Sequence, residues 1–143
     1  MDLGLRGKVA LVTGASAGIG EAVALALGAE GVRLAVAARR REIEDLAARA
    51  QAAGALEARA FTVDQSSAGS IAQLCAGVEA QCGPIEILVV NGGGPRPGTF
   101  SPIPALVLSN AFRGAVAAAL KSLASETGQT ISIDGGLTAG VFG

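Results

Sequence analysis

The chain contains no tyrosine, no histidine and no tryptophan, and its aromatic residues amount to four phenylalanines. Imidazole is the side chain that most often moves protons in enzymes and phenol is another that can, so their absence limits the chemistry that these 143 residues can perform. Half of the residues are hydrophobic but only 3% are aromatic. The core must therefore be built mainly from Ala, Val, Leu and Ile.

Cysteine is also scarce, since Cys75 and Cys82 are the only two in the chain. A structural zinc site takes four ligands, mostly cysteine and histidine, and this sequence cannot supply such a set. The sequence thus predicts no metal centre. We expect both cysteines to be small buried or half-buried residues of a protein in a reducing compartment.

Charge of either sign is low, with a formal net charge of -1. No basic field favours nucleic acid, and no polybasic flank favours a membrane surface. The longest nearly uncharged runs are interrupted by Pro or Gly, which argues against a membrane span. The opening Met1-Asp2-Leu3 lacks the apolar core of a signal peptide. We therefore expect a cytoplasmic protein without a nucleic-acid or membrane partner.

Glycine, by contrast, is abundant, and three of the glycines follow a recognisable spacing. The apolar run Val9–Thr13 has the length of a strand, and glycines follow at positions 14, 18 and 20 before a helix-like run begins. A strand, a glycine turn and a helix N-terminus together form an anion site, because free N–H groups and the helix dipole face the turn. This arrangement predicts a dinucleotide site whose diphosphate would be held by backbone N–H groups of Gly14, Ser16, Gly18, Ile19 and Gly20.

Strand and helix patterns alternate along the chain. The predicted strands are 9–13, 33–37, 57–63, 85–90 and 130–133, and the predicted helices are 19–30, 42–53, one that starts at a cap on Ser67 or Ser70 and runs to Gln81, and 105–124. Such alternation predicts an α/β fold with a doubly wound parallel sheet and right-handed crossovers. Its ligand would lie at the carboxyl ends of the strands. We treat residues 1–143 as a single dinucleotide-binding domain.

The segment Thr13–Gly20, TGASAGIG, resembles the glycine turn of the short-chain dehydrogenase/reductase family. Asp64 after the third strand, Asn91–Gly94 after the fourth, and TGQTISIDGG from Thr127 follow in the order of that family. The run 102–113 is similar to a bacterial branch described as 3-oxoacyl-ACP-reductase-like. The resemblance implies a Rossmann-type fold and a nicotinamide-dependent oxidoreductase.

Two blocks of the family pattern are missing, so the fold is expected to be shortened. After Phe100 the family continues through a helix and a strand with a catalytic Ser, and after Glu126 through a further strand and a segment over the substrate. The apparent junctions lie near 100/101 and 126/127. Either the chain is truly short, or its residues were joined across omitted segments.

The cofactor type is predicted from the residues after the second strand. An acidic residue there would bind the ribose 2′-hydroxyl of NAD, but Ala37 and Ala38 precede Arg39-Arg40-Arg41. We expect Arg39, helped by Arg40, to pair with the 2′-phosphate of NADP, so NADP is favoured over NAD. The alternative is a solvated basic turn.

The resemblance also implies that Asp64 contacts adenine and that Asn91 and Gly92 lie beneath the adenosine ribose. The alternative for these residues is the ordinary turn chemistry of strand ends.

The catalytic assignment rests on Ser109 and Arg113. The family carries a Tyr and a Lys four residues apart on this helix, and here Ser109 and Arg113 have that spacing. An aliphatic hydroxyl is a far poorer acid than a phenol with a pKa of about 10. Arg113 cannot shuttle a proton, but it can bind ribose hydroxyls.

Two functions follow from these observations. The first is an NADP-dependent oxidoreductase that transfers hydride between nicotinamide and a small carbonyl or secondary alcohol. The alternative is a cofactor-binding domain with little or no turnover, because the Tyr and Ser of the family site are missing. The apolar Ala/Leu/Val face of 105–124 predicts a homo-oligomer.

Overall fold

The computed structural model describes residues 3–39, 42–92 and 129–132. The predicted loop from residue 93 and the predicted helix 105–124 lie outside these residues. The elements in chain order are β1 (Val9–Thr13), α1 (Gly18–Ala29), β2 (Arg33–Ala38), α2 (Ile43–Ala53), β3 (Glu57–Thr62), α3 (Ala68–Cys82), β4 (Ile87–Val90) and β5 (Gln129–Ser132).

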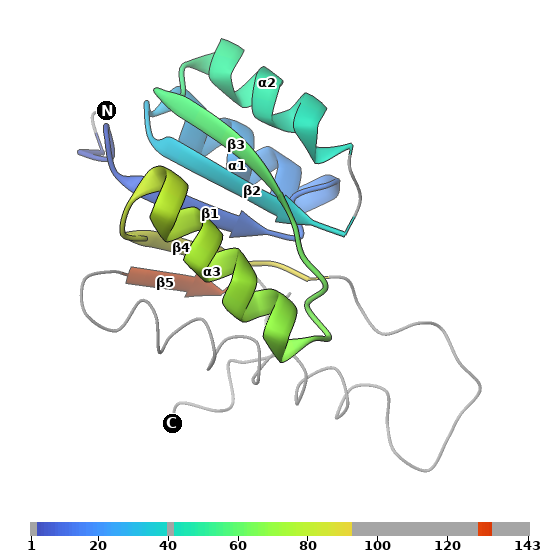
Figure 1. The fold of residues 1–143 in the computed structure, drawn as a ribbon. Coiled ribbons are helices and arrows are strands. Elements are labelled where there is room, and N and C mark those ends of the chain that lie inside the picture. The colour runs from blue at the N-terminus through green and yellow to red at the C-terminus, as the bar shows by residue number, and fades with distance from the viewer. Residues whose placement is uncertain (1–2, 40–41, 93–128, 133–143) are drawn as a thin grey trace, which may run out of the picture.

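The strands form one sheet with the order β3-β2-β1-β4-β5 (Figure 1). Each neighbouring pair is parallel, with Val12 opposite Val36 on one side and Val89 on the other. The predicted Rossmann-type parallel sheet is thus confirmed. The chain proceeds from β1 outward to β3 on one side and then crosses to β4 on the other. A doubly wound sheet binds its ligand at such a reversal, outside the carboxyl ends of the strands.

Helices α1 and α2 cover one face of the sheet, and α3 covers the other (Figure 1). Successive residues of a strand point to opposite faces, so Ala10 and Val12 pack towards α1 and α2 whereas Val9 and Leu11 pack towards α3. Every residue of β1 is buried. This explains its unbroken apolar sequence, which is typical of a strand covered on both sides.

Small residues let the helices approach closely. A Cβ atom placed on Gly28 of α1 would lie 3.0 Å from the carbonyl oxygen of Ala50 in α2.

At the start of α3, Ser67 is the cap, because its hydroxyl accepts a hydrogen bond from the N–H of Ser70 at 3.2 Å. The choice that the sequence left open between Ser67 and Ser70 is thereby resolved.

The predicted bounds differ from the observed ones by one or two residues. Most notably, β4 begins at Ile87 rather than at residue 85, and β5 spans Gln129–Ser132 rather than 130–133. Ile85 is nevertheless buried, because it packs against the α3 face before the chain enters the sheet. In β3, Ala58 and Ala60 pack on the side of α1 and α2, and Phe61 packs on the side of α3.

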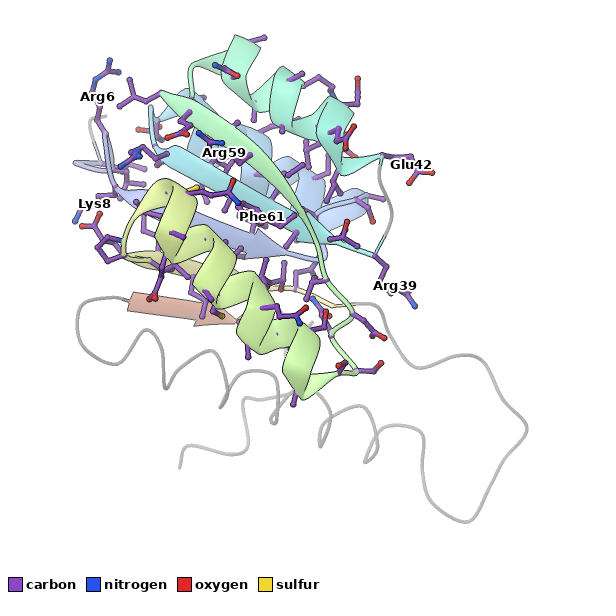
Figure 2. All side chains as sticks on the ribbon, in the orientation of Figure 1. Arg6, Lys8, Arg39, Glu42, Arg59 and Phe61 are labelled. Carbon is purple, nitrogen blue, oxygen red and sulfur yellow. The ribbon has the colours of Figure 1, made fainter. Side chains whose placement is uncertain are left out.

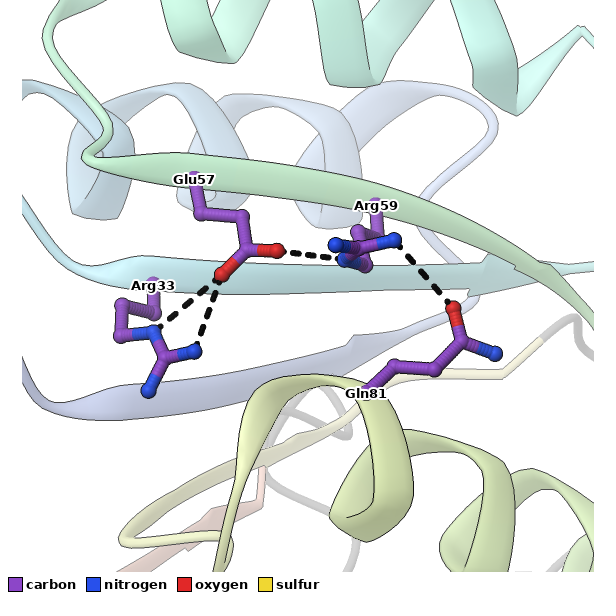
Figure 3. A network of polar contacts seen from close by, with 4 residues as sticks. All are labelled: Arg33, Glu57, Arg59 and Gln81. Atoms are coloured by element: carbon purple, nitrogen blue, oxygen red, sulfur yellow. Dashed lines mark hydrogen bonds and ion pairs between the residues drawn. The ribbon is translucent and has the colours of Figure 1, made fainter.

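A charged network ties β2, β3 and α3 together at the amino end of the sheet (Figure 3). One carboxylate oxygen of Glu57 accepts from Arg33 at 3.2 and 3.0 Å, and the other accepts from Arg59. Arg59 also donates to Gln81 of α3 at 3.5 Å. Hydrogen bonds from Arg59 and then from Arg33 hold the pKa of Glu57 below its ordinary value. The network lies at the opposite end of the strands from the glycine turn.

Candidate functional site

The glycine turn connects the carboxyl end of β1 to the N-terminus of α1. Gly14 and Gly18 both adopt the left-handed backbone region, with φ of 61° and 62°. The side chains of Ser16 and Ile19 are exposed. Ala17, the residue that caps α1, makes no side-chain hydrogen bond to the helix. The first N–H groups of α1 therefore lack a side-chain cap and face the carboxyl edge of the sheet.

The three glycines of the turn meet different surroundings. A Cβ atom on Gly14 would collide with the backbone carbonyl of Asn91, and one on Gly20 would lie 2.7 Å from the side-chain nitrogen of Asn91. A Cβ atom on Gly18 would have no described atom within 4 Å. Gly14 and Gly20 are thus required by packing within the protein, whereas no atom of the described residues crowds Gly18.

Asn91 is anchored at the end of β4 by its backbone and its side chain. Its N–H donates to the hydroxyl of Thr13 at 3.1 Å, and its carbonyl accepts from the same hydroxyl at 2.9 Å. Its side-chain amide donates to the carbonyl of Gly14 at 3.1 Å. Thr13 is only 1% exposed. Asn91 therefore holds the end of β1 and the glycine turn against β4.

Gln65 lies in the segment between β3 and α3 and reaches the same place. Its side-chain nitrogen donates to the carbonyl of Asn91 at 2.9 Å. The sequence assigned no role to Gln65 or to the hydroxyl of Thr13. Both residues lie at or next to the carboxyl end of a predicted strand, and polar residues at such positions meet at one edge of a parallel sheet. This position could have indicated that both belong to the site. Their partner could not be read from the sequence.

Asp64 and Arg39 bring opposite charges to this edge. Arg39 follows β2 and extends away from the end of the sheet that carries Arg6 and Lys8 (Figure 2). One carboxylate oxygen of Asp64 accepts from the N–H of Ser66 at 2.9 Å and from its hydroxyl at 2.5 Å. These hydrogen bonds hold the pKa of Asp64 below its ordinary value, and the positive charge of Arg39 acts in the same direction. Arg39 joins none of the salt bridges formed within the described part of the chain.

The structure gathers most of the predicted cofactor-binding residues at the carboxyl edge of the sheet. They are Gly14, Ser16, Gly18, Ile19, Gly20, Arg39, Asp64, Asn91 and Gly92. Three further predicted residues, Arg40, Ser109 and Arg113, lie outside the described residues.

Across residues 3–39, 42–92 and 129–132, no cluster of His, Cys, Asp or Glu has the make-up of a metal site. No helix within those ranges is both long and apolar enough to cross a membrane.

The two cysteines are buried, unpaired thiols on the core-facing side of α3, and their burial was expected from the sequence. Desolvation raises the pKa of both thiols above the ordinary value, which favours their protonated form. They face the core and lie apart from the carboxyl edge.

The parallel sheet, its three layers and the glycine turn define a Rossmann-type α/β protein. The family model described as short chain dehydrogenase matches residues 8–125. The chain therefore belongs to the short-chain dehydrogenase family, and the resemblance seen at Thr13–Gly20 is confirmed.

Curated relatives and solved structures agree with this assignment. A 2,3-dihydro-2,3-dihydroxybenzoate dehydrogenase of Bacillus subtilis (strain 168) is 40% identical over 96 residues, which cover 66% of this chain and 36% of that protein. A 3-oxoacyl-[acyl-carrier-protein] reductase of Pseudomonas aeruginosa is 40% identical over 92 residues, 64% of this chain and 37% of that protein. The crystal structure of L-sorbose reductase from Gluconobacter frateurii, complexed with NADPH and L-sorbose, matches with a TM-score of 0.80 and 25% identity.

That structural match covers 92% of this chain and 54% of the reductase chain. The chain thus spans little more than a third of the length of these two curated relatives, and about half of the solved reductase.

Proposed function

We propose that this chain binds NADP and acts as an oxidoreductase that transfers hydride between the nicotinamide and a small carbonyl or secondary alcohol. The observation that carries the proposal is the open glycine turn beside Arg39, in a fold similar to that of a reductase complexed with NADPH. The family supports the same reaction class, since its members matched here are named dehydrogenases and reductases.

The residues at the carboxyl edge fit the diphosphate of such a cofactor. Gly18 leaves open space where a side chain would stand, and the first turn of α1 has no side-chain cap at Ala17. Backbone N–H groups there can donate hydrogen bonds to the oxygens of a diphosphate, and the dipole of α1 favours the negative charge. We assign the diphosphate to the backbone of Gly14, Ser16, Gly18, Ile19 and Gly20.

The adenosine half would lie along the ends of β2, β3 and β4. Arg39, with Arg40, would pair with the 2′-phosphate, because no acidic residue stands at the end of β2 to bind a 2′-hydroxyl. Asp64 would accept from the adenine amino group. Asn91 and Gly92 would form the floor beneath the ribose.

When bound, the nicotinamide supplies the hydride chemistry, and the chain has to orient the substrate and move a proton. Arg113 would hold the nicotinamide ribose by donating to its hydroxyls. Ser109 would stand beside the substrate oxygen as the proton donor. A general acid contributes typically 10²–10⁴-fold to a rate, and a serine hydroxyl would forgo most of this because of its high pKa.

A second candidate function is cofactor binding with little or no turnover. It is favoured by one observation, which is that the sequence has no tyrosine to act as the proton donor of the family. Under this proposal NADPH binds as above, but no carbonyl substrate is reduced at a measurable rate.

The domain organisation belongs to the proposal as well. We propose a single shortened domain with junctions near 100/101 and 126/127, a cytoplasmic location and a homo-oligomer formed through 105–124. The mass of the purified protein tests the shortened domain, because a mass well above 14.0 kDa would contradict it. Light scattering at micromolar concentration tests the oligomer, and a monomer would contradict it.

The cofactor assignment is tested by titrating the chain with NADPH and NADH in the calorimeter. We expect NADPH to bind more tightly, and Arg39→Ala to remove most of this preference by weakening NADPH about tenfold. Arg6→Ala is the matched control, because Arg6 is an exposed arginine at the opposite end of the sheet (Figure 2). Equal affinities of the unaltered chain for NADPH and NADH would refute the assignment to NADP.

A further inference from the structure

Gln65 is a half-buried residue whose side chain spans two parts of the carboxyl edge. It belongs to the segment after β3, which passes the ends of β2 and β1 before α3 begins (Figure 1). Its nitrogen donates to the carbonyl of Asn91 at 2.9 Å, although 26 positions separate the two residues in the sequence. The segment that carries Asp64 is thereby tied directly to the end of β4.

The bond completes the hydrogen bonding of the Asn91 carbonyl. A carbonyl oxygen has two lone pairs, and the hydroxyl of Thr13 and the amide of Gln65 each donate to one. The N–H of Asn91 donates to Thr13 and its side-chain nitrogen donates to Gly14, so both its backbone and its side chain are held by neighbours. Asn91 therefore has a fixed position that does not depend on a ligand.

Gly92 makes room for the other end of the same side chain. A Cβ atom on Gly92 would lie 2.7 Å from the side-chain oxygen of Gln65, which is closer than nonbonded atoms approach. Gln65 thus lies over Gly92 while its nitrogen holds Asn91. The one side chain fixes the two residues that would form the floor beneath the adenosine ribose.

We propose that Gln65 is a positioning residue for the adenosine half of the cofactor, an inference that rests on the proposed function. Gln65 sets the spacing between Asp64, which would receive the adenine, and the floor formed by Asn91 and Gly92. When the residues of this edge are fixed before binding, less conformational entropy is lost as the ligand binds, and the affinity is higher. The residue acts through Asn91 and not by contact with the reacting atoms.

A purely structural role makes a different prediction from a positioning role. A structural bond would lower the melting temperature when lost, but the molecules that remain folded would bind nucleotide with unchanged affinity. A positioning bond would weaken every ligand that contains the adenosine half by a similar factor. It would leave the preference between NADPH and NADH unchanged, because Arg39 and not Gln65 is assigned to the 2′-phosphate.

The test is a titration of Gln65→Met with adenosine 2′,5′-bisphosphate, NADPH and NADH, well below the melting temperature. Methionine keeps the length of the side chain but cannot donate to Asn91. We expect all three ligands to bind about fivefold more weakly, which corresponds to one neutral hydrogen bond. Gln73→Met is the matched control, since Gln73 is an exposed glutamine of α3. Unchanged affinity of Gln65→Met for adenosine 2′,5′-bisphosphate would overturn the positioning role.

Amide exchange without ligand provides an independent measurement. The peptide that covers 87–92 should exchange faster in Gln65→Met than in the unaltered chain, and exchange at the same rate would count against the proposal. Should Gln65→Met not fold, Gln65→Glu serves in its place, because ionised glutamate keeps the length and also cannot donate. If the unaltered chain binds none of the three nucleotides, the proposed function falls and this inference with it. If it binds them and Gln65→Met binds equally well, only the inference falls.

Discussion

Gly14 and Gly18 form a natural matched pair for measuring how tightly the glycine turn is packed against Asn91. Their backbone φ angles are 61° and 62°, so an alanine at either position suffers the same left-handed strain. They differ in what the new methyl group would meet. At Gly14 it would lie 2.8 Å from the carbonyl carbon of Asn91, and at Gly18 no described atom lies within 4 Å.

The expected cost of each substitution follows from these surroundings. The left-handed conformation costs a non-glycine residue about 1–2 kcal/mol, and Gly18→Ala should lose only this amount. Gly14→Ala adds an overpacking cost of about 1–3 kcal/mol, because a backbone group must move and Asn91 is held by Thr13 and Gln65. The total for Gly14→Ala is thus about 2–5 kcal/mol.

Thermal and denaturant unfolding measure the difference between the two variants. With a shift of about 3 °C per kcal/mol, Gly18→Ala should melt about 3–6 °C lower and Gly14→Ala about 6–15 °C lower than the unaltered chain. Unchanged denaturant m-values would show that the folded and unfolded states remain comparable.

A third variant, Gly69→Ala, controls for the substitution itself. Gly69 lies in the first turn of α3 without a positive φ, and the nearest atom to its new methyl group is 3.8 Å away. Alanine should stabilise this helix by about 0.5–1 kcal/mol. If Gly14→Ala were no less stable than Gly18→Ala, the close packing of the turn against Asn91 would be refuted.

Two further predictions concern the buried hydroxyl and the charged network. Thr13→Val should lower the free energy of unfolding by about 1–3 kcal/mol, because it leaves the N–H of Asn91 without its partner. Thr13→Ser keeps this hydrogen bond and should lose only about 0.8 kcal/mol, for the missing methyl group. Equal unfolding free energies of the two variants would contradict this prediction. The pKa of Glu57 is lowered on folding, so its contribution is present above its ordinary value of 4.5 and disappears as the pH falls through the lower folded value. The stability difference between the unaltered chain and Glu57→Gln should therefore shrink in acid, and a pH-independent difference would contradict the assignment.

The layout of the fold was predictable because its signals are local. The apolar run Val9–Thr13 and the glycines after it specify a strand, a turn and a helix, and alternation then dictates a parallel sheet. The first and last residues of the strands were less predictable, since the start of β4 depends on which residues pair with β1. Apolar character alone extended that strand to Ile85, which is buried without being part of it.

The contacts at the candidate site were less predictable, for a physical reason. The family resemblance predicted that Asn91 lies beside the cofactor, but it could not show that Asn91 is hydrogen-bonded to Thr13, Gly14 and Gln65. The bond from Thr13 joins residues 78 positions apart, so it depends on the pairing of β1 with β4. Hydrogen bonds of this kind follow from tertiary structure and leave no periodic pattern in the sequence.

The same contacts explain why one short motif contains glycines with different tasks. Gly14 and Gly20 exclude side chains so that the turn can close on Asn91, while Gly18 excludes one towards open space. The part of the turn that touches Asn91 is therefore fixed by the sheet, whereas at Gly18, in the part that would face a diphosphate, no described atom occupies the position of a side chain. Because the part of the turn that packs against Asn91 is ordered without a ligand, binding of a diphosphate would require little free energy for ordering the backbone. Substitutions at Gly14 and Gly20 should consequently act first on folding, and a substitution at Gly18 should act first on nucleotide affinity.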